Sequence, residues 1–333
     1  MTDLKFSWLS DFVPRRGLAN GHAQSVAGNF WLRPKFKLEA EAEAVLVDAE
    51  DGSRVLCHCH WQANPCEKLT VVLVHGLEGS SNSRYIQGVA ARLWAAGMNV
   101  VRMNQRNCED SDALTPTLYH SGRSADVGVV VDYFAAKFGL NRVALVGYSM
   151  GGNLVLKLAG EWGQRAPLVA VVAVSPALNL AASSAALHTG LNRLYEWWFL
   201  RGLKARHKRK AKLFPEIYPA DVGPLGSVRE FDEKLVAPFS GFASADDYYE
   251  RAAAARVVDG IRVPTLILHS DDDPFIKIIP ETRAALRANP AIHFVLTEHG
   301  GHCAFLSNQR GEDVHWAEMT VARYLENFEA GER

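Results

Sequence analysis

The sequence has few cysteines, no excess of charge of one sign and no long unbroken hydrophobic run. Its 333 residues include 5 cysteines, and an odd number argues against a disulfide framework in a chain of this length. Lys and Arg number 36 against 37 Asp and Glu, giving a net charge of -1. No overall field therefore favours nucleic acid, and we expect no nucleic-acid partner.

The sequence also gives little indication of a membrane-spanning segment or an export signal. A long stretch without a charge, residues 166–187, contains Pro176, Asn179, Ser183 and Ser184, and only its first third is strongly apolar. A buried strand followed by a loop explains this stretch better than a membrane span. The first twelve residues include Asp3 and do not read as a signal peptide. We therefore expect a cytoplasmic protein.

The run Cys57-His58-Cys59-His60 looks like a metal site at first glance. Alternate residues of an extended strand point to opposite faces, so the two cysteines would face away from the two histidines. Four side chains divided in this way cannot surround one ion. We predict no metal site, and the sequence implies no other cofactor.

Apolar strand-like runs alternate with helical patterns along the chain. Nearly continuous apolar runs, typical of parallel strands buried on both faces, lie at residues 70–74, 99–103, 142–146, 169–174, 265–269 and 292–296. Two earlier runs, 44–47 and 54–61, flank the turn signal Asp51-Gly52 and predict an antiparallel hairpin. Helical patterns cover residues 85–96, 125–138, 153–161, 281–288 and roughly 312–328. The alternation predicts a mostly parallel, doubly wound α/β sheet.

One long segment interrupts the alternation. Between the strand ending near Val174 and the strand at residue 265, the sequence has helical and loop character. We expect this insertion to form a helical cap, at approximately residues 178–258, within a single domain spanning residues 1–333. The N-terminal region, residues 4–37, has few periodic features and is expected to pack along the domain surface.

Gly147-Tyr148-Ser149-Met150-Gly151 is a G-x-S-x-G sequence between a strand and a helical pattern. This is the context of a nucleophile elbow, in which a serine projects from a sharp strand-to-helix turn. Side chains two residues to either side would collide, so both positions favour glycine. The Met150 amide, at the start of the helix, could stabilise an oxyanion. A glycine-rich turn without chemistry is the alternative.

A nucleophilic serine needs a base and an acid, which in this architecture follow it in the order Asp, His. The strand at residues 265–269 leads into three successive aspartates, and we predict Asp273 as the acid because it directly precedes the turn that a proline opens. The last strand leads into His299-Gly300-Gly301-His302. We predict His302 as the base, because two glycines let its loop swing toward the serine.

The second oxyanion donor should come from the loop after the strand at residues 70–74. The Leu77 amide is the natural partner of the Met150 amide, with Gly76 allowing the backbone to approach closely. His75, in the same loop, is expected to be an architectural hydrogen-bonding residue rather than an acid–base group.

These motifs together resemble a known family. They are Asn20-Gly21-His22-Ala23-Gln24-Ser25, HGLEGSSNSRY at residues 75–85, MNQRNC at 103–108, GYSMGGN, DDPF at 272–275 and HGGHCAF at 299–305. Over nearly its whole length the chain resembles the α/β-hydrolase superfamily, and within it the YheT-like hydrolases, relatives of ABHD-type esterases. The resemblance implies an α/β-hydrolase fold and short- to medium-chain acyl esters as substrates.

Two positions depart from the family pattern. Asn107 stands where the family has glycine, and asparagine tolerates a positive φ better than most residues. Cys303 follows the HGGH sequence where a glycine is usual, and its side chain is expected to narrow the pocket.

The sequence therefore predicts a serine esterase that works through a covalent acyl-enzyme. An acyltransferase or a lipid-active (phospho)lipase would use the same triad, and a non-catalytic binder on the same scaffold is a further alternative. Because only neutral His302 accepts the serine proton, activity should rise with pH through about 6 to 7.5.

We expect Tyr148, beside the nucleophile, and Tyr195, Trp198 and Phe199 of the cap to contact the substrate. The cap aromatics precede a basic run at residues 204–210, whose lysines and arginines are expected to face water. A membrane-surface helix is the alternative, and a lid over an apolar pocket is favoured.

Overall fold

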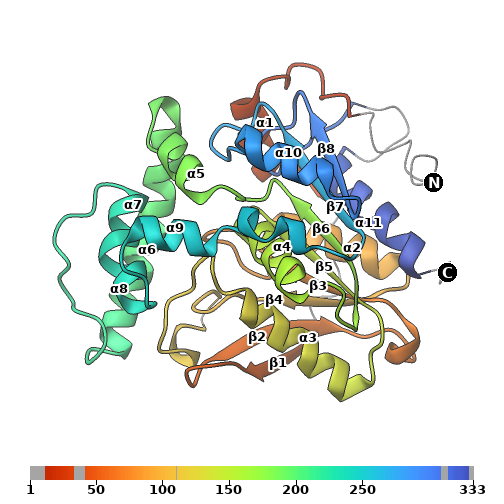
Figure 1. Ribbon diagram of the computed structural model, residues 1–333, viewed down its shortest axis with the longest axis horizontal. Coiled ribbons are helices and arrows are strands. Elements are labelled where there is room, and N and C mark those ends of the chain that lie inside the picture. The colour runs from red at the N-terminus through yellow and green to blue at the C-terminus, as the bar shows by residue number, and fades with distance from the viewer. Residues whose placement is uncertain (1–11, 34–41, 110, 309–313, 330–333) are drawn as a thin grey trace.

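The computed structural model describes residues 12–33, 42–109, 111–308 and 314–329. At its centre is an eight-stranded sheet with the order β1-β2-β4-β3-β5-β6-β7-β8 (Figure 1). The strands are β1 (Glu43–Asp48), β2 (Arg54–His60), β3 (Thr70–Val74), β4 (Asn99–Met103), β5 (Val143–Tyr148), β6 (Leu168–Val174), β7 (Thr265–Ser270) and β8 (Ile292–Thr297). β1 and β2 form the predicted hairpin, β2 also runs antiparallel to β4, and the other neighbours are parallel. The predicted mostly parallel α/β sheet is confirmed.

Burial explains the two kinds of strand pattern. Every residue of β3, β4 and β5 is buried, because helices cover both faces of the central strands. In β1, at the edge, Val45 and Val47 are buried while Leu46 between them is exposed. An edge strand with one covered face needs apolar residues only at alternate positions.

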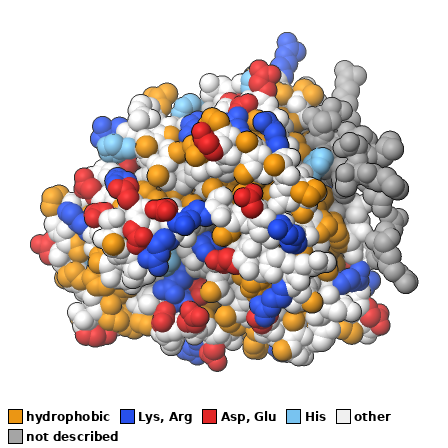
Figure 2. All heavy atoms as spheres, viewed as in Figure 1, with side chains coloured by type: hydrophobic (Ala, Val, Ile, Leu, Met, Phe, Trp, Pro, Cys, Tyr) orange, Lys and Arg blue, Asp and Glu red, His pale blue; other side chains and the backbone are white. Residues whose placement is uncertain are grey.

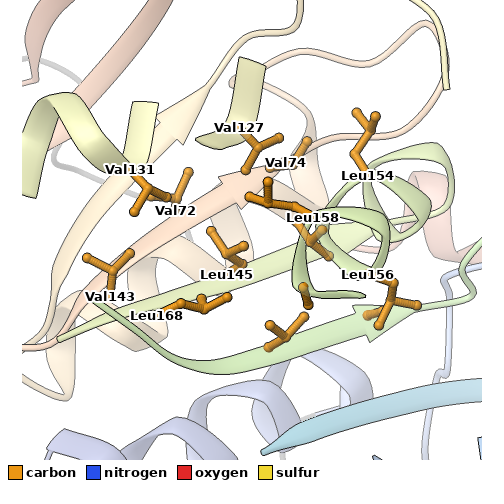
Figure 3. Close-up of a cluster of buried hydrophobic side chains, with 14 of the residues drawn as sticks. Val72, Val74, Val127, Val131, Val143, Leu145, Leu154, Leu156, Leu158 and Leu168 are labelled. Carbon is orange, nitrogen blue, oxygen red and sulfur yellow. The ribbon is translucent and has the colours of Figure 1, made fainter. Parts of the chain in front are cut away.

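Two layers of helices enclose the sheet. One face packs against α3 (Ser124–Phe138), α4 (Met150–Trp162) and α10 (Pro280–Ala288), and the other against α2 (Arg84–Ala95) and α11 (Trp316–Glu329). Figure 3 shows part of the first cluster, where Val131 and Leu158 of the helices lie near Val72 and Leu145 of the strands. Burying one such side chain stabilises the fold by about 1.5 to 3 kcal/mol. This packing fixes the strand ends from which the candidate residues project.

A further helix, α1 (Gly21–Phe30), lies in the N-terminal region, where no helix was predicted. The Asn20 side chain caps it by accepting a hydrogen bond from the Ala23 amide. Its buried face consists of small and polar residues, namely Gly21, Gln24, Ser25 and Gly28. A search for apolar periodicity misses such a helix because no apolar stripe marks its buried face.

Between β6 and β7 the described chain is helical and contains no strand. It comprises α5 (Leu180–Leu187), α6 (Arg193–Leu213), α7 (Val228–Phe231), α8 (Ala237–Phe239) and α9 (Ala245–Ala252), with the short helical turns η5 (Gly190–Asn192), η6 (Asp232–Val236), η7 (Ala254–Arg256) and η8 (Val258–Gly260). Figure 1 shows α5 to α9 as a lobe beside the sheet, which we call the cap. Its hydrophobic cluster includes Leu203 and Phe231 and continues to Met150, the first residue of α4. Two other turns, η3 (Pro65–Glu67) and η4 (Asp112–Leu114), lie before the cap.

The basic run on α6 corrects one expectation. Its lysines and arginines were predicted to face water, but Arg206 and Lys210 are buried. The Lys210 ammonium donates hydrogen bonds to the carbonyl oxygens of Asp112 and Thr115. Burial lowers the pKa of Lys210 to about 8, although the Asp112 charge opposes the shift. These two cations thus fasten the cap to the rest of the molecule, because long side chains can reach buried acceptors from a helix.

The surface carries both signs of charge. Figure 2 shows acidic and basic side chains interspersed over the face in view, in keeping with the net charge of -1. Within the described ranges, no helix combines the length and the apolar character needed to cross a membrane.

Candidate active site

The candidate nucleophile lies on a sharp turn between β5 and α4. Ser149 has φ 54° and ψ -116°, a conformation that costs a non-glycine residue about 1 to 3 kcal/mol. A Cβ at Gly147 would lie 2.2 Å from the carbonyl oxygen of Gly151, and a Cβ at Gly151 would lie 2.2 Å from that of Val74. Space therefore requires both glycines, which is the collision expected from the sequence. The turn directs the serine away from the sheet.

Asp273 and His302 form a hydrogen-bonded pair. Nδ1 of His302 lies 2.8 Å from Oδ2 of Asp273. The other carboxylate oxygen accepts hydrogen bonds from the amides of Ile276, at 2.9 Å, and Phe275, at 3.2 Å. Burial alone would raise the pKa of Asp273, but the facing imidazole and the Ile276 amide hold it below its usual value. The carboxylate is thus held ionised, with one oxygen fixed toward the imidazole.

The neighbouring candidates lie elsewhere. Asp271 is half exposed and pairs with an arginine at 2.7 Å. Asp272 accepts a hydrogen bond from the Gly301 amide at 2.8 Å and faces Nδ1 of His299 at 3.4 Å. Asp273, by contrast, is hydrogen-bonded to His302, which lines the outer cavity together with Ser149, whereas His299 lines neither cavity. The geometry therefore favours the acid and base predicted from the sequence over these alternatives.

His302 lies beside a second group that affects its ionisation. Burial favours the neutral ring, but the Cys303 sulfur, 3.6 Å from Nε2, and the Asp273 carboxylate together hold the pKa of His302 well above the ordinary 6.5. Nε2 is the ring nitrogen not bonded to the aspartate, and it is the nitrogen that a catalytic base would turn toward the serine.

The pH profile of ester hydrolysis should reflect this environment. Since a protonated ring cannot accept a proton, kcat/KM should rise as the pH rises through the raised pKa, with a midpoint above 6.5. Cys303→Ala should move the midpoint toward 6.5, because it removes the sulfur but retains Asp273. A flat profile between about pH 5 and pH 8, for an ester whose acyl transfer limits the rate, would contradict His302 as the base.

Two backbone amides beside Ser149 are free to bind an anion. Within the described part of the chain, neither the Leu77 nor the Met150 amide donates a hydrogen bond to another group. A Cβ at Gly76 would lie 3.1 Å from the Ser149 Cβ, so the loop that carries Leu77 passes directly beside the nucleophile. Met150 opens α4, and the first amides of a helix carry partial positive charge. The two predicted oxyanion donors thus flank the serine.

Buried contacts fix the loop that carries Leu77. His75 Nε2 accepts a hydrogen bond from the Gln105 amide at 3.1 Å, so Nδ1 carries the proton and donates to the Gly76 carbonyl oxygen at 2.8 Å. Burial lowers the pKa of His75 to about 4. A neutral histidine that is engaged at both nitrogens supports the loop and is not an acid–base group.

A second set of contacts joins the same loop to the cap. Glu78, which has φ 55°, accepts hydrogen bonds from the Tyr119 hydroxyl at 2.7 Å and from the Arg206 guanidinium of α6 at 3.0 Å. A Cβ at Gly202, one turn earlier on α6, would lie 2.1 Å from the Glu78 carboxylate. The cap helix and the oxyanion loop are therefore in direct contact.

The helix α1 holds the loop that carries the base. The Ser25 hydroxyl accepts a hydrogen bond from the His302 amide at 2.8 Å. The Gln24 side chain makes two hydrogen bonds with the backbone of Leu306, at 3.1 and 2.9 Å. The N-terminal motif at residues 20–25, which the sequence offered only as a family resemblance, thus positions the loop that carries His302. In the sequence, the only indication of this role was a group of polar residues in a region without apolar periodicity.

Two cavities meet at Ser149. The inner cavity, about 880 Å³ including space open to solvent, lies under the cap, and its apolar lining includes Leu77, Leu118, Leu180, Leu187, Leu203 and Phe231. The outer cavity, about 1110 Å³, is lined by His302 together with aromatic and charged side chains that include Glu78, Arg84, Tyr195, Trp198 and Phe199. An apolar space on one side of the serine and a more polar space on the other can receive the two halves of an ester.

The four residues predicted to contact the substrate do not all line the two cavities. Phe199 lines both cavities, whereas Tyr195 and Trp198 line only the outer one. Tyr148 lines neither, and for this residue the prediction was wrong. Its side chain is 1% exposed and packs against the Tyr85 ring, 4.8 Å between centroids, on the α2 face of the sheet. Alternate residues of a strand point to opposite faces, and this position falls on the core side.

The two departures from the family pattern occupy positions that favour glycine. Asn107 has φ 64°, so asparagine preserves the turn as expected. Cys303 has φ 59°, and its side chain lines the outer cavity next to the base. The thiol thus occupies space that a glycine would leave open, as predicted.

The described residues hold no group of three or more His, Cys, Asp or Glu side chains placed to bind a metal ion. In β2, Cys57 and Cys59 are buried in the cluster on the α3 and α4 face. The His60 ring instead packs against Trp94 of α2, on the opposite face. The run therefore alternates between the two faces as the strand geometry predicted.

A serine on a strained strand-to-helix turn, an Asp–His pair after later strands and a helical cap are the parts of an α/β hydrolase. Residues 70–309 match the family described as the alpha/beta hydrolase fold, and the chain belongs to this family.

Within the family, the chain is similar to YheT of Escherichia coli strain K12, a protein that is named as an esterase. The two are 32% identical over 332 residues, covering 97% of this chain and 95% of YheT. Phospholipase ABHD3 of Mus musculus is 31% identical over 239 residues, covering 71% of this chain and 58% of that protein. The Pyrococcus furiosus esterase Pf2001 has the same fold, with a TM-score of 0.59 at 17% identity, covering 89% of this chain and 97% of that one. The resemblance inferred from the motifs is confirmed, and the chain is a hydrolase of the esterase and lipase type.

Proposed function

We propose that this protein is a serine hydrolase that cleaves carboxylic esters of short- to medium-chain acyl groups through a covalent acyl-enzyme. One observation carries the proposal. The strained Ser149 and His302 line the same cavity, and Asp273 fixes the far nitrogen of the histidine at 2.8 Å. Side chains and backbone amides of the chain suffice for this reaction.

In the first half-reaction, Ser149 Oγ attacks the acyl carbon while His302 Nε2 takes the hydroxyl proton. The carbonyl oxygen becomes an oxyanion, to which the Leu77 and Met150 amides donate hydrogen bonds. The protonated imidazole gives its proton to the departing alcohol as the carbon–oxygen bond breaks. A water molecule then repeats these steps, transfers its proton to His302 and releases the acid. Asp273 stabilises the imidazolium in both halves.

The two cavities suggest how the substrate lies. The acyl chain enters the inner cavity, where leucine and phenylalanine side chains replace water around it. The alcohol portion leaves through the outer cavity, which is lined by His302 and by charged groups such as Glu78 and Arg84. This orientation places the leaving oxygen beside the base that must protonate it.

The volume of the outer cavity favours one second candidate function. An alcohol could occupy that space beside His302 and take the acyl group in place of water, which would make the enzyme an acyltransferase. Both functions are tested with a series of p-nitrophenyl esters from acetate to laurate, assayed with and without short alcohols. Hydrolysis predicts free acid as the main product in both assays, whereas acyl transfer predicts new esters. The absence of p-nitrophenol release for every chain length would contradict both.

Phe199→Ala should shift the chain-length preference toward longer acyl groups, because Phe199 lines both cavities. Each methylene newly buried is worth about 0.8 kcal/mol, so relative kcat/KM should rise about fourfold per carbon accommodated. The p-nitrophenyl series measures this ratio. Trp197→Ala is the matched control, since Trp197 lies on the same helix, is 61% exposed and lines neither cavity. An equal shift in both variants, or no shift in Phe199→Ala, would contradict a role of Phe199 in limiting the acyl cavity.

A further inference from the structure

The inner cavity is not apolar throughout. Asp232, which belongs to the cap turn η6, lines this cavity together with Ser149. The side chain is 8% exposed. A carboxyl group placed in the wall of an apolar cavity is costly to bury and has to be hydrogen-bonded to be tolerated.

Only one oxygen of this carboxyl group is engaged. The Tyr249 hydroxyl donates a hydrogen bond to Asp232 Oδ2 at 2.7 Å, and the Ser184 hydroxyl lies 3.0 Å from the Tyr249 oxygen. Oδ1 accepts no hydrogen bond from any residue that the structure describes. The guanidinium of Arg229 acts on the charge from a distance, but it is paired with Asp246 at 2.7 Å. One acceptor position is therefore left for a group that the chain does not supply.

Other polar groups of the same cavity wall are engaged within the protein. Arg206 pairs with a glutamate at 3.0 Å, the Tyr248 hydroxyl accepts a backbone amide at 2.9 Å, and the Ser183 hydroxyl accepts another at 3.2 Å. A purely structural tie between η6 and α9 needs only the Tyr249 contact. The second oxygen of Asp232 is thus a carboxyl acceptor in the cavity wall that the described packing leaves without a partner.

We propose that Asp232 is a specificity-determining residue that binds a hydroxyl group on the acyl chain of the substrate. The inference rests on the proposed function, because it takes the inner cavity as the acyl site. The ester carbonyl lies at Ser149, the chain runs under the cap, and its hydroxyl meets Asp232 Oδ1. The preferred substrates are then esters of hydroxy fatty acids.

A hydroxyl group suits this carboxyl better than other polar groups. Burial raises the pKa of Asp232 to about 7, although the Tyr249 hydroxyl and the Arg229 charge oppose the shift. Near neutral pH the group therefore exists in both forms. A hydroxyl donates to the ionised form and accepts from the protonated form, whereas an ammonium group suits only the ionised form. A plain alkyl chain satisfies neither.

The test compares p-nitrophenyl octanoate with its hydroxyoctanoate isomers, one hydroxyl position at a time. In the natural protein, one position should raise kcat/KM at least about tenfold over the plain ester, the effect of one hydrogen bond to a buried polar group. Asp232→Asn should retain the preference because its amide still donates and accepts. Asp232→Leu should abolish the preference, because a leucine side chain can neither donate nor accept a hydrogen bond. Glu250→Gln, which alters an exposed carboxylate of α9 in the cap, is the matched control and should keep the preference.

Equal rates for the plain ester and every hydroxy isomer in the natural protein would overturn the inference, and this comparison needs no variant. A preference that survives in Asp232→Leu, or a stronger preference for an aminooctanoate ester, would also overturn it. Melting curves establish that each variant is folded. If one of these outcomes occurs while a fluorophosphonate labels Ser149 and plain esters are cleaved, only the role of Asp232 is overturned, and the proposed function stands. If Ser149 is not labelled and no ester is cleaved, the proposed function fails together with the inference.

Discussion

Ser149→Ala is expected to abolish labelling by a fluorophosphonate probe and to lower kcat for ester hydrolysis by about 10⁴- to 10⁶-fold. The reason is that no other hydroxyl occupies the elbow between β5 and α4, where the free amides of Leu77 and Met150 converge within the described structure. Mass spectrometry of the labelled peptide and steady-state kinetics with a p-nitrophenyl ester measure the two effects.

Ser184→Ala is the matched control for this variant. Ser184 also lines the inner cavity, but its hydroxyl is bonded to Tyr249 at 3.0 Å rather than placed beside a histidine. The control should keep stoichiometric labelling at Ser149. Labelling of a different serine, or full activity in Ser149→Ala, would overturn the proposed mechanism.

Asp273→Asn is expected to lower kcat by about 10²- to 10⁴-fold. The carboxylate now accepts a hydrogen bond from His302 Nδ1 at 2.8 Å and, through its other oxygen, from two backbone amides. An asparagine can keep the amides on its oxygen only by turning its NH₂ group toward the imidazole. That arrangement selects the wrong tautomer and leaves the imidazolium without a counter-charge. Steady-state kinetics on a folded variant measures the loss.

Asp271→Asn and Asp272→Asn serve as the controls, and each should cost much less activity. Asp271 is half exposed on the surface. Asp272 accepts a hydrogen bond from the Gly301 amide, and an asparagine oxygen can still accept it. If Asp272→Asn proved the most damaging of the three, the acid would be displaced by one residue from the position assigned to it.

The fold and the elbow could be predicted because strict local rules govern them. Parallel strands that are covered on both faces are nearly continuous apolar runs, as in β5 and in β3, where only Thr70 is polar. The glycines around Ser149 are required because a Cβ at either position would lie only 2.2 Å from a backbone oxygen, so no other residue fits there. The order of acid and base follows from the order of the strands, and it limited the candidates to a few neighbouring positions.

Other features depend on contacts between distant parts of the chain and could not be predicted in this way. The helix α1 packs through polar and small residues, so only its partners in the loop at residues 301–306 explain its position. Arg206 and Lys210 belong to a basic run that looks solvent-exposed until their acceptors, Glu78 and the carbonyl groups near η4, are known. The face on which Tyr148 lies depends on the exact end of β5.

The contact between α1 and the catalytic loop also has a bearing on how the enzyme is made. Ser25 and His302 are 277 residues apart in the sequence, so they can meet only when almost all of the described chain has been translated. A chain still emerging from the ribosome can form the elbow at Ser149 once the strands before it have paired, yet it has no base to activate the hydroxyl. If Ser149 and His302 act as proposed, the order of synthesis leaves the hydroxyl without a base until the loop that carries His302 has packed against α1.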